Sequence, residues 1–290
     1  MHPAIEKLLN GAPVILDGAW GTEMQARGLP IGGCPDEWNL SHAAQVEEIP
    51  RAYVQAGSRI VLTNTFRGNR IALADYDLAE RAAAINRAGA EISRRAAGGE
   101  ARVFASIGPC GKMLFAGEVD RDQLFDAFRE QARALADGGA DGLVVETMAE
   151  LDEARLALRA ARETGLPVVA CMVFDSGEAR DRTMMGVTPE QAAAELAGAG
   201  ADVVGANCGQ GIAGFVEICR RMRAATGRPL WIKANAGLPE MVDGRVVYRT
   251  SPEQFASHAR ALVDAGANFI GGCCGTSPAY IQALAKEIGA

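Results

Sequence analysis

Two adjacent cysteines near the C-terminus, Cys273 and Cys274, have the clearest capacity for chemistry in this sequence. They follow the apolar run 267–271 and stand among glycines. A disulfide between neighbouring cysteines would strain both the bridge and the peptide that joins them. A sharp turn, which glycine permits, can instead direct both sulfurs to one metal ion.

A third cysteine has a similar setting. Cys208 follows the apolar run 202–206 and precedes a glycine, as Cys274 does. Three sulfurs at the ends of two predicted strands are typical of a zinc site with one open coordination position. We therefore predict that Cys208, Cys273 and Cys274 are the metal-binding and catalytic residues.

The other cysteines have a simpler interpretation. Free cysteine is among the most buried residue types and often acts as a small apolar side chain. We expect that role for the remaining four of the seven cysteines, Cys34, Cys110, Cys171 and Cys219. Because Cys110 also follows a predicted strand, a role at the site stays open for it.

The composition is that of an ordinary globular protein and excludes several function classes. Of the 290 residues, 49% are hydrophobic and 22% are charged, and the net charge is −7 with no basic block, so we expect no nucleic-acid partner. No apolar run approaches the ~18 residues of a membrane span, and the N-terminus does not resemble a signal peptide. An odd number of cysteines fits a reducing compartment, so we expect a cytoplasmic protein.

Apolar runs alternate with helical patterns along the whole chain. The apolar runs predict strands over 13–16, 59–63, 103–107, 142–145, 167–172, 202–206, 230–234 and 267–271. The helical patterns cover 41–55, 71–97 with an interruption near 75–78, 124–135, 154–161 and 215–225, and further helices begin after Thr188, Ser251 and Ser277. Thr188 and Ser251 each precede Pro-Glu-Gln, which combines an N-cap, a first-turn proline and a capping box.

Strands that alternate with helices form a parallel sheet, and eight such units fit a closed (β/α)8 barrel. A doubly wound sheet would instead place a glycine-rich phosphate loop after the first strand, and residues 17–22 do not have that pattern. No linker or change in composition divides the chain. We therefore predict an α/β fold with a single TIM-barrel domain over residues 1–290.

In such a barrel the active site lies at the C-terminal ends of the strands. These ends carry Asp17, Asn64, Gly108, Glu146, Cys208, Asn235 and the pair Cys273–Cys274. Glu146 ends a fully apolar run, where an unpaired carboxylate is costly, so a functional role is favoured. Asp17 could instead cap a loop, and Asn64 and Asn235 could order loops.

The chemistry of this set favours a small amino-acid thiol as the substrate. Zinc held by three thiolates carries a net charge of about −1, which makes it a poor Lewis acid for hydrolysis. It is better suited to binding a further thiol, removing its proton and keeping the sulfur nucleophilic. The two carboxylates nearby would receive an ammonium group.

Five segments resemble the homocysteine S-methyltransferase family, and the resemblance extends over nearly the whole chain. They are Asp17–Thr22, Thr63–Phe66, Asn207–Cys208, Asn235–Gly237 and Gly271–Thr276. The combination of Cys208 with Cys273 and Cys274 is the most specific feature. Residues 35–39 and the Asn-Ala-Gly turn are most similar to the homocysteine module of cobalamin-dependent methionine synthase.

The resemblance implies roles for individual residues. It implies zinc on Cys208, Cys273 and Cys274, with the homocysteine sulfur as the fourth ligand. It also implies that Asp17 and Glu146 bind the substrate ammonium and that the backbone around Gly18 binds its carboxylate. Asn64 and Asn235 complete the expected substrate site, and Asn235 matches a position that can occupy the open metal site before substrate arrives.

The sequence also departs from the family pattern. Lys233 stands near Asn235 where the pattern leads us to expect proline or an acid. We expect the chain to hold the barrel alone, without the folate, cobalamin and activation modules of a full methionine synthase. The dimerisation extension of betaine–homocysteine methyltransferases is not expected either.

The sequence therefore predicts a zinc-dependent methyltransferase that activates homocysteine, or a close thiol, as a zinc thiolate and methylates its sulfur to give methionine. We expect the methyl group to come from a methylcorrinoid protein supplied in trans. One alternative is direct transfer from a small onium donor, of betaine or sulfonium type, bound in the barrel. Another is a non-catalytic subunit that binds zinc or a thiol.

Overall fold

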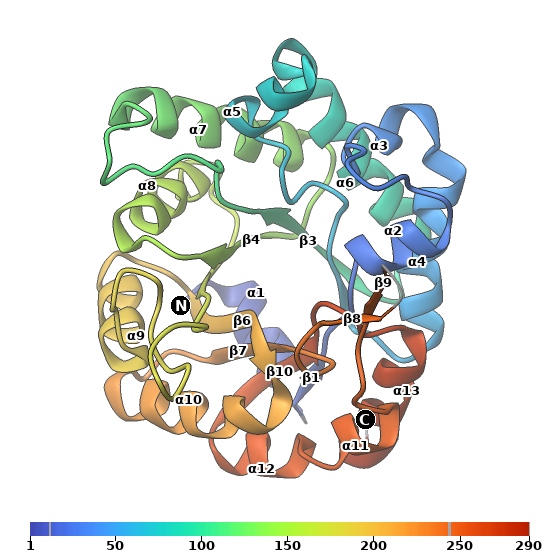
Figure 1. Ribbon diagram of the computed structural model, residues 1–290, viewed down its shortest axis with the longest axis vertical. Coiled ribbons are helices and arrows are strands. Elements are labelled where there is room, and N and C mark those ends of the chain that lie inside the picture. The colour runs from blue at the N-terminus through green and yellow to red at the C-terminus, as the bar shows by residue number, and fades with distance from the viewer. Residues whose placement is uncertain (12, 243–244, 290) are drawn as a thin grey trace.

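The computed structural model describes residues 1–11, 13–242 and 245–289. A ring of parallel strands lies at its centre and helices surround this ring (Figure 1). The strands of the ring are β1 (Val14–Ile15), β2 (Ile60–Val61), β3 (Arg102–Ile107), β4 (Gly142–Met148), β5 (Val168–Met172), β6 (Val203–Gly211), β7 (Leu230–Asn235) and β10 (Ala267–Gly272).

The topology confirms the predicted barrel. The eight strands are hydrogen-bonded in the order β1-β10-β7-β6-β5-β4-β3-β2, and every pairing in this sheet is parallel. A single parallel bridge between Leu16 and Ile60 joins β1 to β2 within the described part of the chain. This bridge closes the ring, so the fold is a (β/α)8 barrel.

The helices follow the predicted pattern with local differences. They are α1 (Pro3–Leu9), α2 (Gly21–Ala26), α3 (Trp38–Ser41), α4 (Ala43–Gln55), α5 (Arg70–Leu73), α6 (Ala82–Ala97), α7 (Arg121–Asp137), α8 (Leu151–Arg162), α9 (Pro189–Gly198), α10 (Ile212–Ala225), α11 (Pro252–Ala256), α12 (Ala259–Asp264) and α13 (Pro278–Ile288). Two 3₁₀ turns between α5 and α6 account for the interruption predicted near 75–78. Both predicted capping boxes, at Thr188 and Ser251, are present.

The helix predicted over 41–55 is shorter than expected. Residues 38–41 form the separate helix α3, and α4 begins at Ala43. The Ser41 hydroxyl donates to the Glu37 carboxylate at 2.6 Å. Ser41 therefore serves the preceding turn and does not cap α4.

The inside of the barrel is filled by every second residue of the strands, because successive side chains of a strand point to opposite faces. The cluster consists of Ile5, Val14, Leu16, Ile60, Leu62, Phe104, Val144, Val169, Cys171, Val203, Trp231 and Phe269. The Trp231 ring lies 6.0 Å from the ring of Phe104 and 5.4 Å from that of Phe269. Ile5, from α1, closes the cluster at the N-terminal end of the barrel. We call this cluster the barrel floor.

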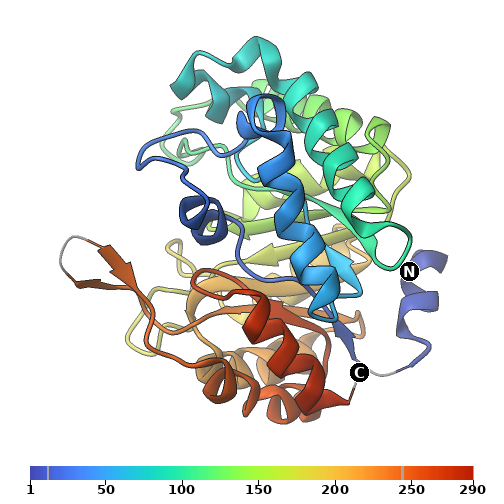
Figure 2. The same ribbon diagram turned by 90° about the vertical axis from the view of Figure 1, so that its right-hand side faces the viewer.

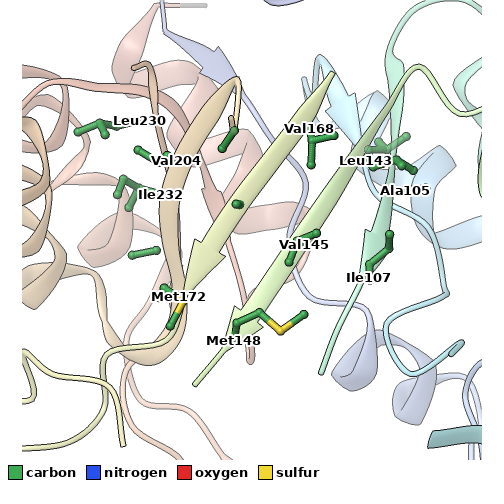
Figure 3. Close-up of a cluster of buried hydrophobic side chains, with 14 of the residues drawn as sticks. Ala105, Ile107, Leu143, Val145, Met148, Val168, Met172, Val204, Leu230 and Ile232 are labelled. Atoms are coloured by element: carbon green, nitrogen blue, oxygen red, sulfur yellow. The ribbon is translucent and has the colours of Figure 1, made fainter. Parts of the chain in front are cut away.

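The alternate residues face the helices and build a second, larger core. Figure 3 shows part of it on strands β3 to β7, including Leu143, Val145, Val204 and Ile232. The floor and this outer core together fix the register of each strand, because a slip by one residue would exchange the two sets of side chains.

One element was not predicted from the sequence. The strands β8 (Glu240–Val242) and β9 (Arg245–Val247) form an antiparallel hairpin after β7. Figure 2 shows this hairpin projecting from the barrel at the end opposite α1. Within the described ranges, no helix is both long and apolar enough to span a bilayer.

Candidate metal centre and cavity

A cavity of about 330 Å³ lies at the C-terminal ends of the strands, above the barrel floor. Several of its charged and polar lining residues lie on the same strands as the floor, two positions further along, and point inward as the floor residues do. Ser106 follows Phe104 by two positions, Glu146 follows Val144, and Lys233 follows Trp231, and all three line the cavity. The alternation that builds the floor therefore also delivers the polar groups above it.

The thiols predicted to bind metal converge at this cavity. The sulfurs of Cys208, Cys273 and Cys274 all lie within 4.8 Å of one another. Cys208 lies near the end of β6 with φ +62°, and the cysteine pair follows β10. After the pair, Gly275 has φ +80°, a backbone conformation that glycine adopts without strain.

The spacing of these sulfurs fits a tetrahedral zinc ion. Zinc–sulfur bonds of about 2.3 Å at tetrahedral angles place two ligand sulfurs about 3.8 Å apart. The Sγ atoms of Cys208 and Cys274 are 3.8 Å apart. The side-chain oxygen of Asn235 is buried with no hydrogen-bond partner among the described residues, while a hydrogen bond from the same side chain helps to lower the pKa of Cys208. An unpartnered buried oxygen beside three thiols is consistent with a metal position.

The three thiols share their charge unequally. Hydrogen bonds from Cys273 and Cys274 lower the pKa of Cys208 to about 3. The hydrogen bond with Cys208 raises the pKa of Cys274 to about 12. A hydrogen bond with Cys208 also raises the pKa of Cys273 well above its usual range. The cluster therefore favours one thiolate, on Cys208.

Glu146 is nearly fully buried and faces the cavity. The Ser106 hydroxyl donates to its Oε1 at 2.5 Å, and the Asn207 amide donates to its Oε2 at 3.4 Å. Burial raises the pKa of Glu146, while Lys233 and the Ser106 hydrogen bond act in the opposite direction. The Glu146 carboxylate thus has only these two hydrogen-bond donors among the described residues and can accept a further hydrogen bond.

Asn207, which precedes Cys208 on β6, holds the end of β4 at Thr147 by two hydrogen bonds. Its Nδ2 donates to Thr147 Oγ1 at 2.6 Å, and the Thr147 backbone N–H donates to its Oδ1 at 2.8 Å. Thr147 and Cys208 both have positive φ, +59° and +62°. Such strained conformations of residues other than glycine persist where the surroundings enforce them, and they cluster at functional sites.

Asp17 lies beneath the cavity and does not line it. Its Oδ1 accepts from Lys233 Nζ at 2.5 Å, and its Oδ2 accepts from the Leu62 backbone N–H at 2.7 Å and Trp20 Nε1 at 3.0 Å. The carboxylate is fully buried. Its predicted contact with a substrate ammonium stays a prediction, and in this structure three donors already surround it.

Lys233 is the charged group that stands between Asp17 and the cavity. Its side chain is 2% exposed and lines the cavity. Burial acts to lower the pKa of Lys233, but Asp17 and Glu146 outweigh it, so the pKa is raised and the group is an ammonium. Sequence reasoning noted Lys233 only as a departure, although a lone lysine in an apolar strand signals a buried partner.

The other predicted substrate residues have different surroundings. Gly18 lines the cavity, and a Cβ there would lie 2.7 Å from the Tyr53 hydroxyl, so only glycine fits. Asn64 lines the cavity too, but its Nδ2 donates to Pro35 O at 2.6 Å and to Asn39 Oδ1 at 3.0 Å. Asn235 is buried beside Cys208 and does not line the cavity.

The remaining cysteines lie outside this cavity. Cys171 belongs to the barrel floor, and Cys110 and Cys219 are buried in the outer core. Cys34 is half-buried and packs against a small cluster near α6. Burial raises the pKa of Cys110 to about 12, helped by nearby Glu153, so this thiol is protonated and unreactive at neutral pH.

Known proteins resemble this chain in both sequence and structure. The sequence model of the homocysteine S-methyltransferase family matches residues 14–288. The methionine synthases of Mycobacterium tuberculosis and Mycobacterium leprae are 32% and 31% identical over 97% and 94% of this chain. The chain spans about a quarter of the length of these relatives, 25% and 24%. The metallated form of the homocysteine methyltransferase MmuM from Escherichia coli has a TM-score of 0.81 at 23% identity, covering 98% of this chain and 99% of that chain, which supports the fold.

Proposed function

The chain belongs to the homocysteine S-methyltransferase family, and we propose that it methylates the sulfur of homocysteine, or of a close thiol, to give methionine. The observation that carries the proposal is the convergence of three thiols with a charged cavity at the C-terminal end of the barrel. The three thiols would hold a zinc ion that binds the substrate sulfur. The charged side chains beside them would bind the ammonium and carboxylate of an amino acid. Neither feature alone specifies an amino-acid thiol.

Cys208, Cys273 and Cys274 would hold the zinc, and Asn235 lies close enough to Cys208 to complete the coordination before substrate arrives. When bound, zinc supplies a position where a substrate thiol binds as its thiolate at neutral pH. The sulfur is then ready to accept a methyl group. The barrel floor below closes the cavity and excludes water from that side.

The substrate's amino-acid end would lie on the other side of the cavity. Glu146, a buried carboxylate of the cavity lining, would bind the ammonium, and Ser106 and Asn207 hold it in place. The backbone at Gly18 lines the same space and would serve the carboxylate. Asn64 would act indirectly, because its amide holds the loop that carries Pro35.

We propose a methylcorrinoid protein supplied in trans as the methyl donor. The exposed large apolar side chains of the described chain, Met1 apart, all lie in segments that lead from a barrel strand to the next long helix, including the β8–β9 hairpin. They are Ile31, Phe66, Phe115, Met184, Met185, Leu238, Met241 and Val246. Apolar surface around the mouth is typical of a protein contact. A macromolecular donor fits this surface better than a small one does.

A small onium donor is the competing candidate. A cation bound in the barrel would favour an aromatic cage. Trp20 and Phe66 line the cavity, whereas Trp38 stacks on His42 at 4.3 Å and does not line it. Two aromatic rings give this alternative some support, so the donor must be tested directly.

The test is a methyl-transfer assay on the zinc-loaded protein with homocysteine and three donors: a methylated corrinoid protein, a betaine and a sulfonium. We expect methionine with the corrinoid donor, and none when Cys273→Ala replaces the wild type. Methionine formed only from an onium compound would reverse the choice of donor. No turnover with any donor, together with retained thiol binding, would favour a non-catalytic binding subunit.

A further inference from the structure

Three charged side chains lie together at the bottom of the cavity, and they have unequal access to it. Lys233 and Glu146 line the cavity, whereas Asp17 is buried behind Lys233. Asp36 and Arg67 also line the cavity, and the Asp36 carboxylate accepts from the Arg67 backbone N–H at 3.1 Å. At the bottom of the cavity, a substrate meets one cation, Lys233, and one anion, Glu146. An ammonium and a carboxylate on the same carbon atom are the complementary pair.

The hydrogen bonds of Lys233 leave part of its ammonium group available. A lysine ammonium has three N–H donors. Among the described residues, the Lys233 ammonium has one hydrogen-bond partner, the Asp17 carboxylate, whose Oδ1 lies 2.5 Å from Nζ. Asp17 in turn is fixed by Leu62 N–H and Trp20 Nε1. The amine is thus held from behind and keeps donors for a ligand in front.

We propose that Lys233 is a specificity-determining residue that binds the carboxylate of the substrate, together with the backbone at Gly18, while Glu146 binds its ammonium. Asp17 is then a positioning residue, which acts by holding Lys233. This inference rests on the proposed function, since it concerns the substrate of the same site, and it narrows that substrate to thiols with a zwitterionic amino-acid end. It also assigns Asp17 a role other than the one predicted from the sequence.

A simpler role for Lys233 is to neutralise Asp17. A buried carboxylate needs a counter-charge, and Lys233 would supply it without touching any substrate. The two roles differ in one respect. Only a direct contact makes the effect of Lys233 depend on whether the ligand has a carboxylate.

The experiment measures binding of three thiols to zinc-loaded protein by calorimetry, with zinc content checked in every variant. Homocysteine has both charges, 3-mercaptopropylamine lacks the carboxylate, and 4-mercaptobutyrate lacks the ammonium. In Lys233→Met, we expect the affinities for homocysteine and 4-mercaptobutyrate to fall about ten- to hundredfold. The affinity for 3-mercaptopropylamine should stay the same or rise, because a repulsive charge is removed. The same change at an exposed lysine, Lys286→Met, should alter none of them.

Lys233→Met leaves Asp17 buried without its cation, which endangers the fold. The double variant Lys233→Met with Asp17→Asn removes both members of the pair and keeps the formal charge of the three side chains as in the wild type. We expect the same selective losses in the double variant. If it recovers wild-type affinity for homocysteine, or if all three thiols lose affinity equally, Lys233 only balances Asp17 and the inference is wrong. If the wild type binds none of the three thiols, the proposed function itself fails.

Discussion

The lower and upper parts of the barrel interior are built by the same strands, two residues apart, yet their side chains differ in kind. Phe104, Val144 and Trp231 form the floor, and Ser106, Glu146 and Lys233 follow them on β3, β4 and β7. Burial of the floor stabilises the fold by removing apolar surface from water. The upper set costs stability, because each polar group there must find a partner away from water.

This contrast shows how one register serves both purposes. The floor fixes the position of each strand along its axis, and the groups above are then placed without further adjustment. We therefore expect substitutions in the floor to lower the free energy of unfolding. Substitutions above the floor should weaken the binding of zinc or thiol.

Replacing Cys273 by alanine should abolish stable zinc binding. The thiol is one of three that converge, and structural zinc sites contribute about 10–16 kcal/mol in small peptides, a contribution lost when a ligand is missing. Metal content measured after dialysis gives the answer. Cys219→Ala is the matched control, because this buried cysteine lies outside the cavity and should leave zinc unchanged. Full zinc occupancy in Cys273→Ala would contradict the assignment.

Replacing Trp231 by alanine should lower the free energy of unfolding by about 3–5 kcal/mol, since a large buried ring leaves a cavity. Trp231 is fully buried between Phe104 and Phe269. Chemical denaturation of the variant and the wild type measures the difference. A loss below about 1 kcal/mol would mean that the floor does not stabilise the barrel in the way its packing indicates.

Replacing Glu146 by glutamine should weaken homocysteine binding about ten- to hundredfold, because a charge-assisted hydrogen bond is lost. Zinc content should not change. The affinity for 4-mercaptobutyrate, which lacks the ammonium, should stay the same or rise slightly. Glu153→Gln is the control: this buried carboxylate accepts from the Cys110 backbone N–H at 2.7 Å and lies outside the cavity. Equal losses for both thiols would make Glu146 a structural residue.

The Ser106→Ala variant should have the smallest effect, a loss of about fivefold in homocysteine affinity at neutral pH. The Ser106 hydroxyl stabilises the charged form of Glu146, so its removal raises the pKa of that carboxyl further. Binding of an ammonium requires the carboxylate, so affinity is present above this pKa and is lost as the pH falls through it. Calorimetry at several pH values should therefore show the loss beginning at a higher pH in Ser106→Ala.

Ser93→Ala provides the control for this change. The Ser93 hydroxyl is also buried, but it donates to Leu62 O and lies outside the cavity. Its removal should leave the pH dependence of homocysteine binding as in the wild type. An identical pH profile for Ser106→Ala and the wild type would show that Ser106 does not tune Glu146.

The sequence predicted the parts of this arrangement that depend on local pattern. Apolar runs gave the strands of the ring, and the topology placed Cys208 beside Cys273 and Cys274 although 65 positions separate Cys208 from Cys273 in the chain. What the sequence did not predict was the pairing of side chains across the ring. Asp17 and Lys233 are 216 positions apart, and their contact exists only once β1 and β7 have paired with the two sides of β10. The β8–β9 hairpin was missed as well, because each strand has only three residues and the successive β8 side chains Glu240 and Met241 are both exposed, so no alternation marks the strand.

The bridge between Leu16 and Ile60 has a consequence for how the protein folds. Strands β1 and β2 are short and adjoin at the seam where the ring closes. Just above the bridge, the Asp17 carboxylate accepts the Leu62 backbone N–H and also holds Lys233 of β7. One side chain thereby joins the first strand to the second and to the seventh. A chain with this seam open lacks the Leu62 N–H that Asp17 accepts, so closing the barrel also completes the hydrogen bonds that fix Asp17 behind Lys233.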